Sequence, residues 1–318
     1  MEEAPSERQP ELSGVVVHWH NEAWLEQLVA AWPRDPRFEL VVVNNGSSRA
    51  LPAGKYLRLE PGANLGFGAG MNFGVARARA PLLLLLNPDV EPQAGALEKL
   101  LEGFEANPQA AGLAPRLVGL DDSPQFRWQL RRLPGPGDLL LQCLFLGSGL
   151  GAREEPPPGT AVAQPAAAAL ALRREGFEAL GGFDPRFFPA WFEDVDLARR
   201  LADRGQPLLY WPRAVFRHGL GSSVSELGYG PFLWVYDRNL MRYLERHHGR
   251  AWAWLARALR AFALGLRLLL LPLRAPARAR SRGEAARGLA IAWLGVVSGW
   301  RRPQALATRF APPAEVEP

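Results

Sequence analysis

The stretch that decides the fold is LSGVVVHWHNEAWLEQLVAAWPRDPRFELVVVNNGSS, residues 12–48. Its two short apolar runs, residues 12–19 and 38–43, are rich in valine and have the composition of buried strands. The segment between them carries leucine and valine at helical spacing. The stretch therefore predicts a βαβ unit of an open α/β sheet. Such sheets bind ligands at the carboxyl ends of their strands, where NNGSS (44–48) lies, although a plain turn also explains NNGSS.

The bulk composition indicates a globular protein. Its 318 residues are 48% hydrophobic, enough for one large domain or two small ones. Cys143 is the single cysteine, so an intrachain disulfide is excluded. Residues 1–11 are polar and acidic and contain no apolar signal-peptide segment, so we expect a disordered tail and a cytoplasmic protein.

A second strand-and-loop region follows. Residues 56–60 form a candidate third strand, and the glycine-rich segment GANLGFGAGMNFG (62–74) leads into a predicted helix over 71–79. Glycines allow a backbone to approach a ligand closely, and the helix N-terminus would suit a phosphate. The segment imitates a dinucleotide-binding fingerprint. It follows the third strand instead of the first, however, and no ribose-binding acid comes after it, which disfavours an oxidoreductase.

The run PLLLLL (81–86) predicts a buried central strand that ends at Asn87-Pro88-Asp89. A carboxylate at that end suits a divalent cation that neutralises a diphosphate. The alternative is an ordinary turn aspartate.

The segment GGFDPRFFPAWFEDVDLARRLADRG (181–205) carries the candidate acid–base chemistry. Glu193, Asp194 and Asp196 stand where an amphipathic helix begins, which the helix dipole favours. Neighbouring aromatic residues form a hydrophobic wall that raises a carboxylate's pKa toward that of a general base. The alternative is a helix N-cap with ordinary first-turn acids.

Six motifs occur in a fixed order: VVVHWHN, FELVVVNNGSS, NLGFGAGMNFG, LLLLLNPDV, RREGFEALGGFDPRFFPAWFEDVDLARRL and RAVFRHGLGSS. Together they closely resemble family 2 glycosyltransferases with the GT-A fold, particularly the bacterial rhamnosyltransferase-like branch. The resemblance covers about residues 13–249. It implies a disordered tail (1–11), an α/β GT-A domain with a mixed sheet flanked by helices (12–249), and a helical C-terminal extension (250–318).

The resemblance also implies roles for individual residues. Asp194 corresponds to the catalytic base, with Glu193 beside it. Asp89 and His218 correspond to ligands of Mg²⁺ or Mn²⁺, and the alternative for His218 is a loop histidine. Trp191, Phe192 and Arg238 would lie near the acceptor. The expected nucleotide-sugar site consists of Asn44, Asn45, Gly46, Asn64, Gly66, Gly68, Asn72, Asn87 and Asp89.

Two positions depart from the family pattern. Asn87 replaces the first acid of the metal motif, and Asn44 replaces an aspartate that commonly follows the second strand. The implied activity is inverting transfer of a sugar, with rhamnose as one candidate, from a nucleoside diphosphate to a saccharide or lipid-linked acceptor in surface polysaccharide synthesis. A non-catalytic nucleotide-sugar-binding or scaffold protein is the alternative.

Residues 121–160 are rich in proline, glycine and arginine. We expect an acceptor loop with some helix at 137–146, or else a flexible surface excursion. Trp128, Arg131 and Arg132 are candidates for stacking on sugar or phosphate.

The C-terminal segment is basic. Residues 250–302 hold eleven arginines and one acid, Glu284, a local charge of +10 that leaves −5 for the rest of the chain. Its apolar runs are too short or too interrupted to span a bilayer. We expect a basic amphipathic helix on an anionic membrane, on the cytoplasmic face. The alternative is an extension packed on the domain or on a second subunit of a homo-oligomer. No nucleic-acid recognition motif accompanies the basic residues.

Overall fold

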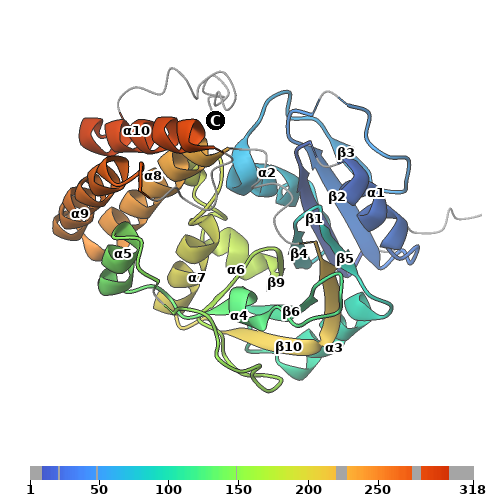
Figure 1. The fold of residues 1–318 in the computed structure, drawn as a ribbon. Helices are drawn as coiled ribbons and strands as arrows, with labels where there is room; N and C mark the ends of the chain where they lie inside the picture. Colours follow the sequence, from blue (N-terminus) through green and yellow to red (C-terminus); the bar gives the residue numbers. More distant parts are fainter. Residues whose placement is uncertain are drawn as a thin grey trace, which may run out of the picture.

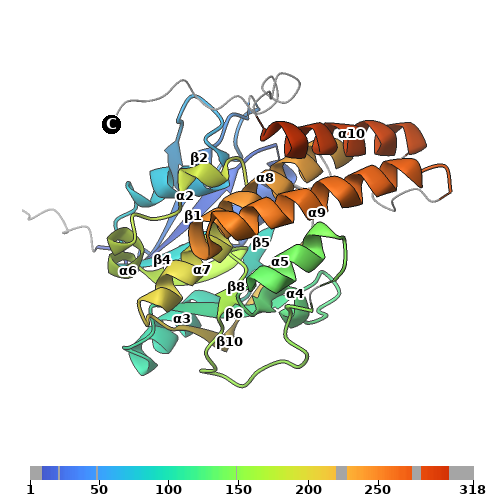
Figure 2. The ribbon, with the colours of Figure 1, turned by 90° about the vertical axis from the view of Figure 1, so that its left-hand side faces the viewer.

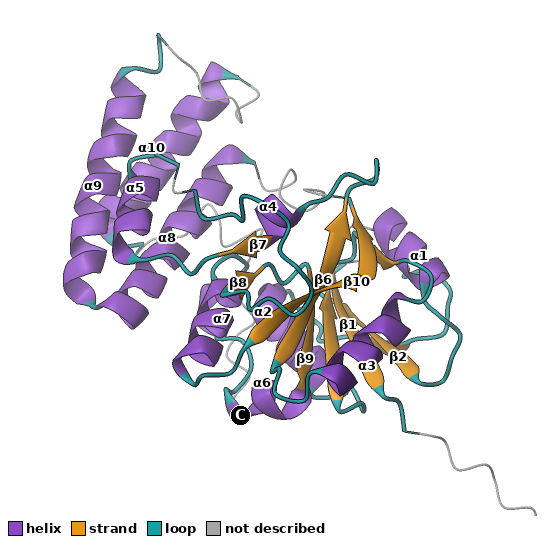
Figure 3. Cartoon of the chain, turned by 90° about the horizontal axis from the view of Figure 1, so that it is seen from below, coloured by secondary structure: helices purple, strands orange, loops and turns teal. Residues whose placement is uncertain are grey.

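A computed structural model describes residues 9–20, 22–47, 49–147, 149–219, 228–273 and 281–300. Within these ranges, eight strands form one mixed sheet in the order β3-β2-β1-β4-β9-β6-β10-β5, and β7 and β8 form a small second sheet (Figures 1 and 3). The strands are β1 (Leu12–His18), β2 (Phe38–Asn44), β3 (Leu57–Leu59), β4 (Leu82–Leu86), β5 (Val90–Pro92), β6 (Gly112–Val118), β7 (Leu130–Arg131), β8 (Gln164–Pro165), β9 (Ala169–Arg173) and β10 (Leu208–His218).

Helices flank both faces of the large sheet and form a separate group beside it (Figures 1 and 3). They are α1 (Glu22–Ala31), α2 (Gly66–Val75), α3 (Ala96–Ala106), α4 (Phe126–Gln129), α5 (Pro136–Cys143), α6 (Arg174–Ala179), α7 (Glu193–Asp203), α8 (Tyr229–His248), α9 (Arg250–Leu269) and α10 (Arg282–Ser298), with a 3₁₀ turn at Pro185–Phe187. No helix of the described ranges is both long and apolar enough to cross a membrane.

The strand directions bring several carboxyl ends to one edge. Strand β1 pairs in parallel with β2 and β4, and β10 pairs in parallel with β6. Strand β9 is antiparallel to both β4 and β6, so β6 and β10 run in the same direction as β4. The segments after β1, β2, β4 and β10 therefore meet at one edge of the sheet, as the βαβ prediction requires.

The sheet is buried on both faces, which explains why its strands read as continuous apolar runs. On one face, Val16 and Leu84 pack with Leu25 of α1 and Leu100 of α3. The valines of β1 that point the other way belong to a second cluster, with Met71 of α2, Phe177 of α6 and Leu197 of α7. Alternation along β1 thus supplies both cores.

Helix α2 begins at Gly66, five residues earlier than the predicted start at Met71, so its glycines lie inside the helix. A methyl group added to Gly70 would stand 3.0 Å from Val17, and one added to Gly74 would stand 2.5 Å from Val15. These two glycines let the helix lie directly on β1. Close packing therefore outweighs the helix-breaking tendency of glycine, about 1 kcal/mol per residue.

The N-terminal boundary also differs from the prediction. Gln9 donates a hydrogen bond from Nε2 to the Arg79 carbonyl (3.1 Å), and the Glu11 N–H donates to the Arg37 carbonyl (2.9 Å). Residues 9–11 are therefore attached to the domain. The rest of the predicted tail, residues 1–8, lies outside the described ranges, as do residues 274–280 and 301–318 of the predicted extension.

Helices α8, α9 and α10 pack together at one side of the molecule, with α5 against α9 (Figure 2). Leu233 of α8, Leu264 of α9 and Leu289 of α10 share one buried cluster. A buried ion pair joins Arg260 of α9 to Asp237 of α8 at 2.8 Å. Helix α8 thus connects the C-terminal helices to the sheet domain. Residues 121–160, expected to be irregular, contain α4, β7 and α5.

Candidate active site

The loop after β2 interlocks with the loop before α2. Asn45 accepts the Leu65 N–H at Oδ1 (2.7 Å) and donates from Nδ2 to Oδ1 of Asn64 (3.0 Å). Asn64 also accepts the Gly66 N–H (2.9 Å). Asn44 donates to the Glu60 carboxylate at 2.9 Å. Asn44, Asn45 and Asn64, three of the residues expected in the nucleotide-sugar site, therefore belong to one interlocked double loop at the ligand-binding edge of the sheet.

Glycines fit this double loop for two different reasons. Gly46 and Gly66 have φ values of +91° and +75°, which favour glycine. A methyl group on Gly66 would also lie 2.8 Å from Phe188 and from the Pro189 carbonyl oxygen. Gly68 has an ordinary helical backbone but packs near Phe183, where a methyl group would stand 3.1 Å away. The start of α2 is thus pressed against the aromatic segment that precedes α7.

Asn72 has a structural role in this structure. Its Nδ2 donates to the Phe183 carbonyl (2.8 Å), and its Oδ1 accepts the Phe183 N–H (2.9 Å). Both ends of the amide therefore hold α2 against the chain before the aromatic segment. Its contact with a donor stays a prediction.

Asp89 and His218 are adjacent because β5 and β10 pair. His218 is the register partner of Val90, and the Gly219 N–H donates to the Asp89 carbonyl (2.9 Å). This backbone pairing brings Nε2 of His218 within 3.7 Å of Oδ1 of Asp89. Both side chains are buried. Asn87 lies just upstream, where its N–H donates to the Ala168 carbonyl at 2.9 Å.

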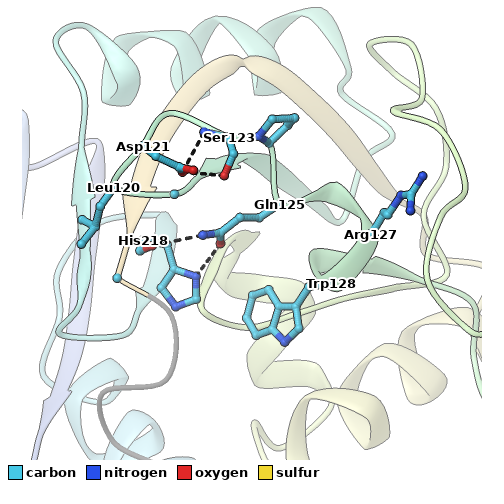
Figure 4. A pocket seen from close by; sticks show the side chains of 10 residues that line it. Leu120, Asp121, Ser123, Gln125, Arg127, Trp128 and His218 are labelled. Atoms are coloured by element: carbon cyan, nitrogen blue, oxygen red, sulfur yellow. Dashed lines mark hydrogen bonds between the residues drawn. The ribbon is translucent and has the colours of Figure 1, made fainter. Parts of the chain in front are cut away.

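Gln125 fixes the orientation of the His218 ring (Figure 4). Its Nε2 donates to the His218 carbonyl (3.1 Å), so its Oε1 is left to accept the proton on Nδ1 of His218 (2.9 Å). Trp128 covers the ring at a centroid distance of 5.0 Å. Burial lowers the pKa of His218, so the imidazole is neutral near pH 7. Nε2 therefore carries its lone pair toward Asp89.

This arrangement suits a divalent cation. A neutral imidazole whose other nitrogen is hydrogen-bonded, next to a carboxylate, is a common pair of metal ligands. The described residues contain no group of three or more histidine, cysteine, aspartate or glutamate side chains that could hold a metal. Two protein ligands leave positions for phosphate oxygens and water, as Mg²⁺ sites usually do.

A cavity of about 410 Å³ opens beside His218 (Figure 4). Asp121 accepts hydrogen bonds from the backbone N–H (3.1 Å) and hydroxyl (2.6 Å) of Ser123, which shapes its rim. The cavity is lined by Gly119, Leu120, Asp121, Ser123, Pro124, Gln125, Arg127, Trp128, His218 and Gly219.

The three acids at the start of α7 have different surroundings. Glu193 is 6% exposed, and burial, with Asp194 nearby, raises its pKa well above the ordinary value. Asp196 is fully buried and bound by Arg200 (2.7 Å), His247 (2.8 Å) and Arg246 (3.1 Å).

Asp194 is the accessible carboxylate of the three. Its side chain is 17% exposed, and Oδ2 accepts a hydrogen bond from Nε2 of Gln164 (3.2 Å). Arg131 lies 3.6 Å from the same oxygen. The arginine and the amide hold the carboxylate in one orientation, as a general base requires. The prediction that Asp194 stands at a helix start is confirmed.

The predicted acceptor residues lie together but differ in exposure. Trp191 is half-buried and meets Phe232 edge to face at 4.9 Å. Phe192 is buried between Tyr236 and Tyr243. Of this set, Trp191 and Arg238 are partly exposed and Phe192 is buried, and the acceptor contacts of all three stay predictions.

Arg238 supports the aromatic segment from α8. It donates to the Phe188 carbonyl and covers the Trp234 ring at 4.8 Å. Burial, together with Arg242, lowers the pKa of Arg238 to about 9. The guanidinium therefore stabilises the aromatic segment that precedes α7.

His18 is a candidate that the sequence analysis missed. It ends β1, is fully buried, and is the register partner of Asn44. Within the described chain neither ring nitrogen has a hydrogen-bond partner, and Nε2 is 3.9 Å from the Glu22 carboxylate. Burial lowers the pKa of His18, so the ring is neutral. The sequence HWHN (18–21) places a histidine at the end of the first strand, and that position was the signal that could have identified His18.

Comparison with known proteins agrees with this geometry. The model of the family "Glycosyl transferase family 2" matches residues 15–153. The chain is 29% identical over 271 residues to the N-acetylglucosaminyl-diphospho-decaprenol L-rhamnosyltransferase of Mycobacterium tuberculosis (strain ATCC 25618 / H37Rv), covering 74% of this chain and 80% of that protein.

Solved structures share the fold. A mannosyltransferase from Pyrobaculum calidifontis, in complex with GDP-Man and Mn²⁺, has a TM-score of 0.53 at 14% identity, covering 93% of this chain and 88% of its own. GalNAc-T7 with UDP, GalNAc and Mn²⁺ has a TM-score of 0.52 at 18% identity. That match covers 77% of this chain and about half, 52%, of the GalNAc-T7 chain.

The sheet order, the carboxylates at its ligand-binding edge and the matches in sequence and fold all agree with one another. Residues 15–153 match the family 2 glycosyltransferases, and the chain has the GT-A fold.

Proposed function

We propose that the protein transfers a sugar from a nucleoside-diphosphate donor to a saccharide or lipid-linked acceptor in the synthesis of a cell-surface polysaccharide. The name of the mycobacterial relative supports L-rhamnose as the first donor sugar to test and a polyprenyl-diphosphate-linked saccharide as the acceptor. A lipid-linked acceptor supports a peripheral location on the cytoplasmic face of the plasma membrane.

In this proposal the donor lies along the edge of the sheet formed by the ends of β1, β2, β4 and β10. The double loop that contains Asn45 and Asn64 would hold the nucleoside. Asp89 and His218 would hold Mg²⁺ or Mn²⁺, which supplies positive charge to the leaving diphosphate when bound. The Mn²⁺ in two structures of the same fold supports this choice of ion.

Asp194 acts as the general base. The acceptor oxygen attacks the anomeric carbon as the bond from that carbon to the diphosphate oxygen breaks, and Asp194 takes the hydroxyl proton. Arg131 and Gln164 orient the carboxylate before the attack. One displacement inverts the configuration of the anomeric carbon. The observation that carries this assignment is that, of the three clustered acids, Asp194 combines exposure with an arginine and an amide at its carboxylate.

Calorimetric titration with a panel of nucleoside-diphosphate sugars, with and without Mn²⁺ or Mg²⁺, tests the proposal. We expect one donor to bind in a metal-dependent way and to be turned over with a lipid-linked acceptor. Failure of every donor to bind in either condition would refute it. Donor binding without turnover on any acceptor would support the non-catalytic alternative. The specific observation in favour of that alternative is that asparagines, Asn44 and Asn87, stand in place of two acids.

A further inference from the structure

The outward face of α9 is apolar. Its exposed side chains recur every three or four residues, so they form one stripe along the helix. The most exposed are Phe262 (65%), Leu269 (78%) and Trp254 (59%). Leu255 and Leu266 lie on the same stripe, at 46% and 43%. A surface helix of a soluble domain normally turns this face toward the core.

The arginines of α9 turn the opposite way. Arg260 is buried in its ion pair with Asp237. Arg257 donates hydrogen bonds to carbonyls in the last turns of α10 (2.5 and 2.8 Å), and Arg267 covers the Phe145 ring at 3.4 Å. The helix is therefore amphipathic, with its apolar side facing outward. Trp252, Trp254 and Phe262, the aromatic residues of the expected basic amphipathic helix, are all exposed.

Helix α10 extends the stripe. Trp293, Leu294 and Val297 are exposed by 36%, 58% and 43%. A methyl group added to Gly265 would lie 3.7 Å from Nε1 of Trp293, so the exposed residues of α10 adjoin those of α9. The combined surface is defined here as the apolar face and consists of Trp254, Leu255, Phe262, Leu266, Leu269, Trp293, Leu294 and Val297.

Cations border the apolar face. Arg250, at the start of α9, and Arg282 and Arg287, of α10, are exposed. The sequence between α9 and α10 adds three more arginines in residues 274–280. Apolar and tryptophan side chains with a rim of arginines are the combination that binds a bilayer interface, where acyl chains accept the apolar groups and anionic headgroups attract the cations.

We propose that the apolar face is the membrane-binding surface of the protein and that it inserts into a bilayer containing anionic lipids. A second copy of the chain fits less well. A two-fold interface brings the same patch together from both subunits, so it would bring the basic rims close to each other, and like charges repel. The proposal deepens the proposed function and rests on it only for the choice of a lipid-linked acceptor.

The position of the apolar face suits such an acceptor. Helix α8 contacts α9 and α10 through Tyr229 and Leu233. From the same helix, Phe232 meets Trp191, and Tyr236 meets Phe192 (5.2 Å between centroids). The bilayer would therefore lie one helix away from the aromatic segment that leads to Asp194.

Vesicle flotation with the full chain tests the proposal, using phosphatidylcholine vesicles with and without phosphatidylglycerol. The test variant is Phe262→Gln/Leu266→Gln, and the control is Leu57→Gln on β3, whose 41% exposure matches that of Leu266. All of these side chains are largely exposed, so we expect the variants to fold. The double variant should bind at least about 10²-fold more weakly, since burying each apolar side chain corresponds to about a tenfold gain or more. Leu57→Gln should bind like the wild type.

Salt and oligomeric state complete the test. At 1 M NaCl the Debye length is about 3 Å, so attraction to anionic lipid is screened while apolar insertion remains. We expect binding to fall to the level seen with neutral vesicles and not below it. Complete loss in salt, or equal binding by the double variant, would overturn the proposal. So would a wild-type dimer that the double substitution dissociates. Calorimetric donor binding by the same variants should be unchanged, which separates failure of this proposal from failure of the proposed function.

Discussion

Substituting the three acids of α7 one at a time should give three different results. Asp194→Asn keeps the size of the side chain but removes its capacity to accept a proton. Since general-base catalysis contributes about 10² to 10⁴-fold, we expect kcat to fall by that factor. Gln164 and Arg131 contact the oxygen of Asp194 from β8 and β7, outside the double loop, so donor affinity should stay the same.

Glu193→Gln should leave turnover nearly unchanged, because burial raises the pKa of Glu193 and so favours its protonated form, which glutamine resembles. The substitution should also stabilise the fold. With a folded pKa above the ordinary 4.5, the native state holds a proton that the unfolded state releases, so the wild type loses stability as pH rises from about 4.5 through the folded pKa. The variant has no such proton. Its advantage in free energy of unfolding should therefore grow over that pH range.

Asp196→Asn should damage stability instead of chemistry. The buried carboxylate is bound by Arg200, Arg246 and His247 at 2.7 to 3.1 Å, and the neutral amide would leave Arg200 without the counter-charge that Asp196 supplies. Arg246 would keep its ion pair with Asp184. Breaking a buried ion pair costs about 3–5 kcal/mol, and partial exposure of Arg246 favours the lower end. At roughly 2–4 °C per kcal/mol, the melting temperature should fall by about 6 °C or more.

Steady-state kinetics and urea denaturation across pH 4 to 8 measure all three variants. A fully active Asp194→Asn together with an inactive, well-folded Glu193→Gln would show that the base has been assigned to the wrong residue. A destabilised Asp194→Asn that binds no donor would show that the residue is structural.

Three further outcomes are expected. Gln125→Leu should weaken Mn²⁺ binding in the presence of a nucleoside diphosphate by about 10- to 100-fold, because the His218 tautomer is no longer fixed, and unchanged affinity in a calorimetric titration would contradict this. Gly66→Ala combines a positive φ with a close backbone neighbour and should cost about 1–3 kcal/mol in urea denaturation, with weaker donor binding. Arg260→Met alone should destabilise the protein by about 3–5 kcal/mol, because it leaves the charge of Asp237 buried and unpaired. Arg260→Met/Asp237→Leu should recover most of that loss of stability. A double variant as unstable as the single one would show that the unpaired charge is not the cause.

The sequence predicted those strands whose side chains are buried on both faces. Strands β1, β2 and β4 are runs of valine or leucine, and the structure has each within about one residue of its predicted bounds. The start of α2 was wrong for a physical reason. Local propensity disfavours glycine in helices, so the glycine-rich segment was predicted to lie before the helix. Packing of α2 on Val15 and Val17 requires glycine inside the helix, and that requirement cannot be read from the local sequence.

The candidate site divides in the same way. Asp89 was predicted because residues at strand ends carry a sequence signal, namely a polar residue after an apolar run, and His218 was predicted from the family resemblance. Gln125 and Gln164 carried none. Their partners, His218 and Asp194, lie 93 and 30 positions away, and a glutamine in a segment rich in proline and arginine resembles any surface residue. The hydrogen bonds of Asn72 to Phe183, 111 positions away, were equally invisible.

The segment 125–131 joins the two halves of the site. At its start, Gln125 and Trp128 contact His218, and at its end Arg131 lies near Asp194. Between them, the fully buried Gln129 donates to the Pro115 carbonyl (2.6 Å) and accepts the Leu117 N–H (3.3 Å), which fixes the segment to β6. His218, the proposed cation ligand, and Asp194, the proposed general base, are therefore both contacted by one short, anchored stretch of chain. The packing of segment 125–131 on the sheet therefore sets the geometry of His218 relative to Asp194. Substitutions that disturb this packing should affect the site without changing the chemistry of either residue.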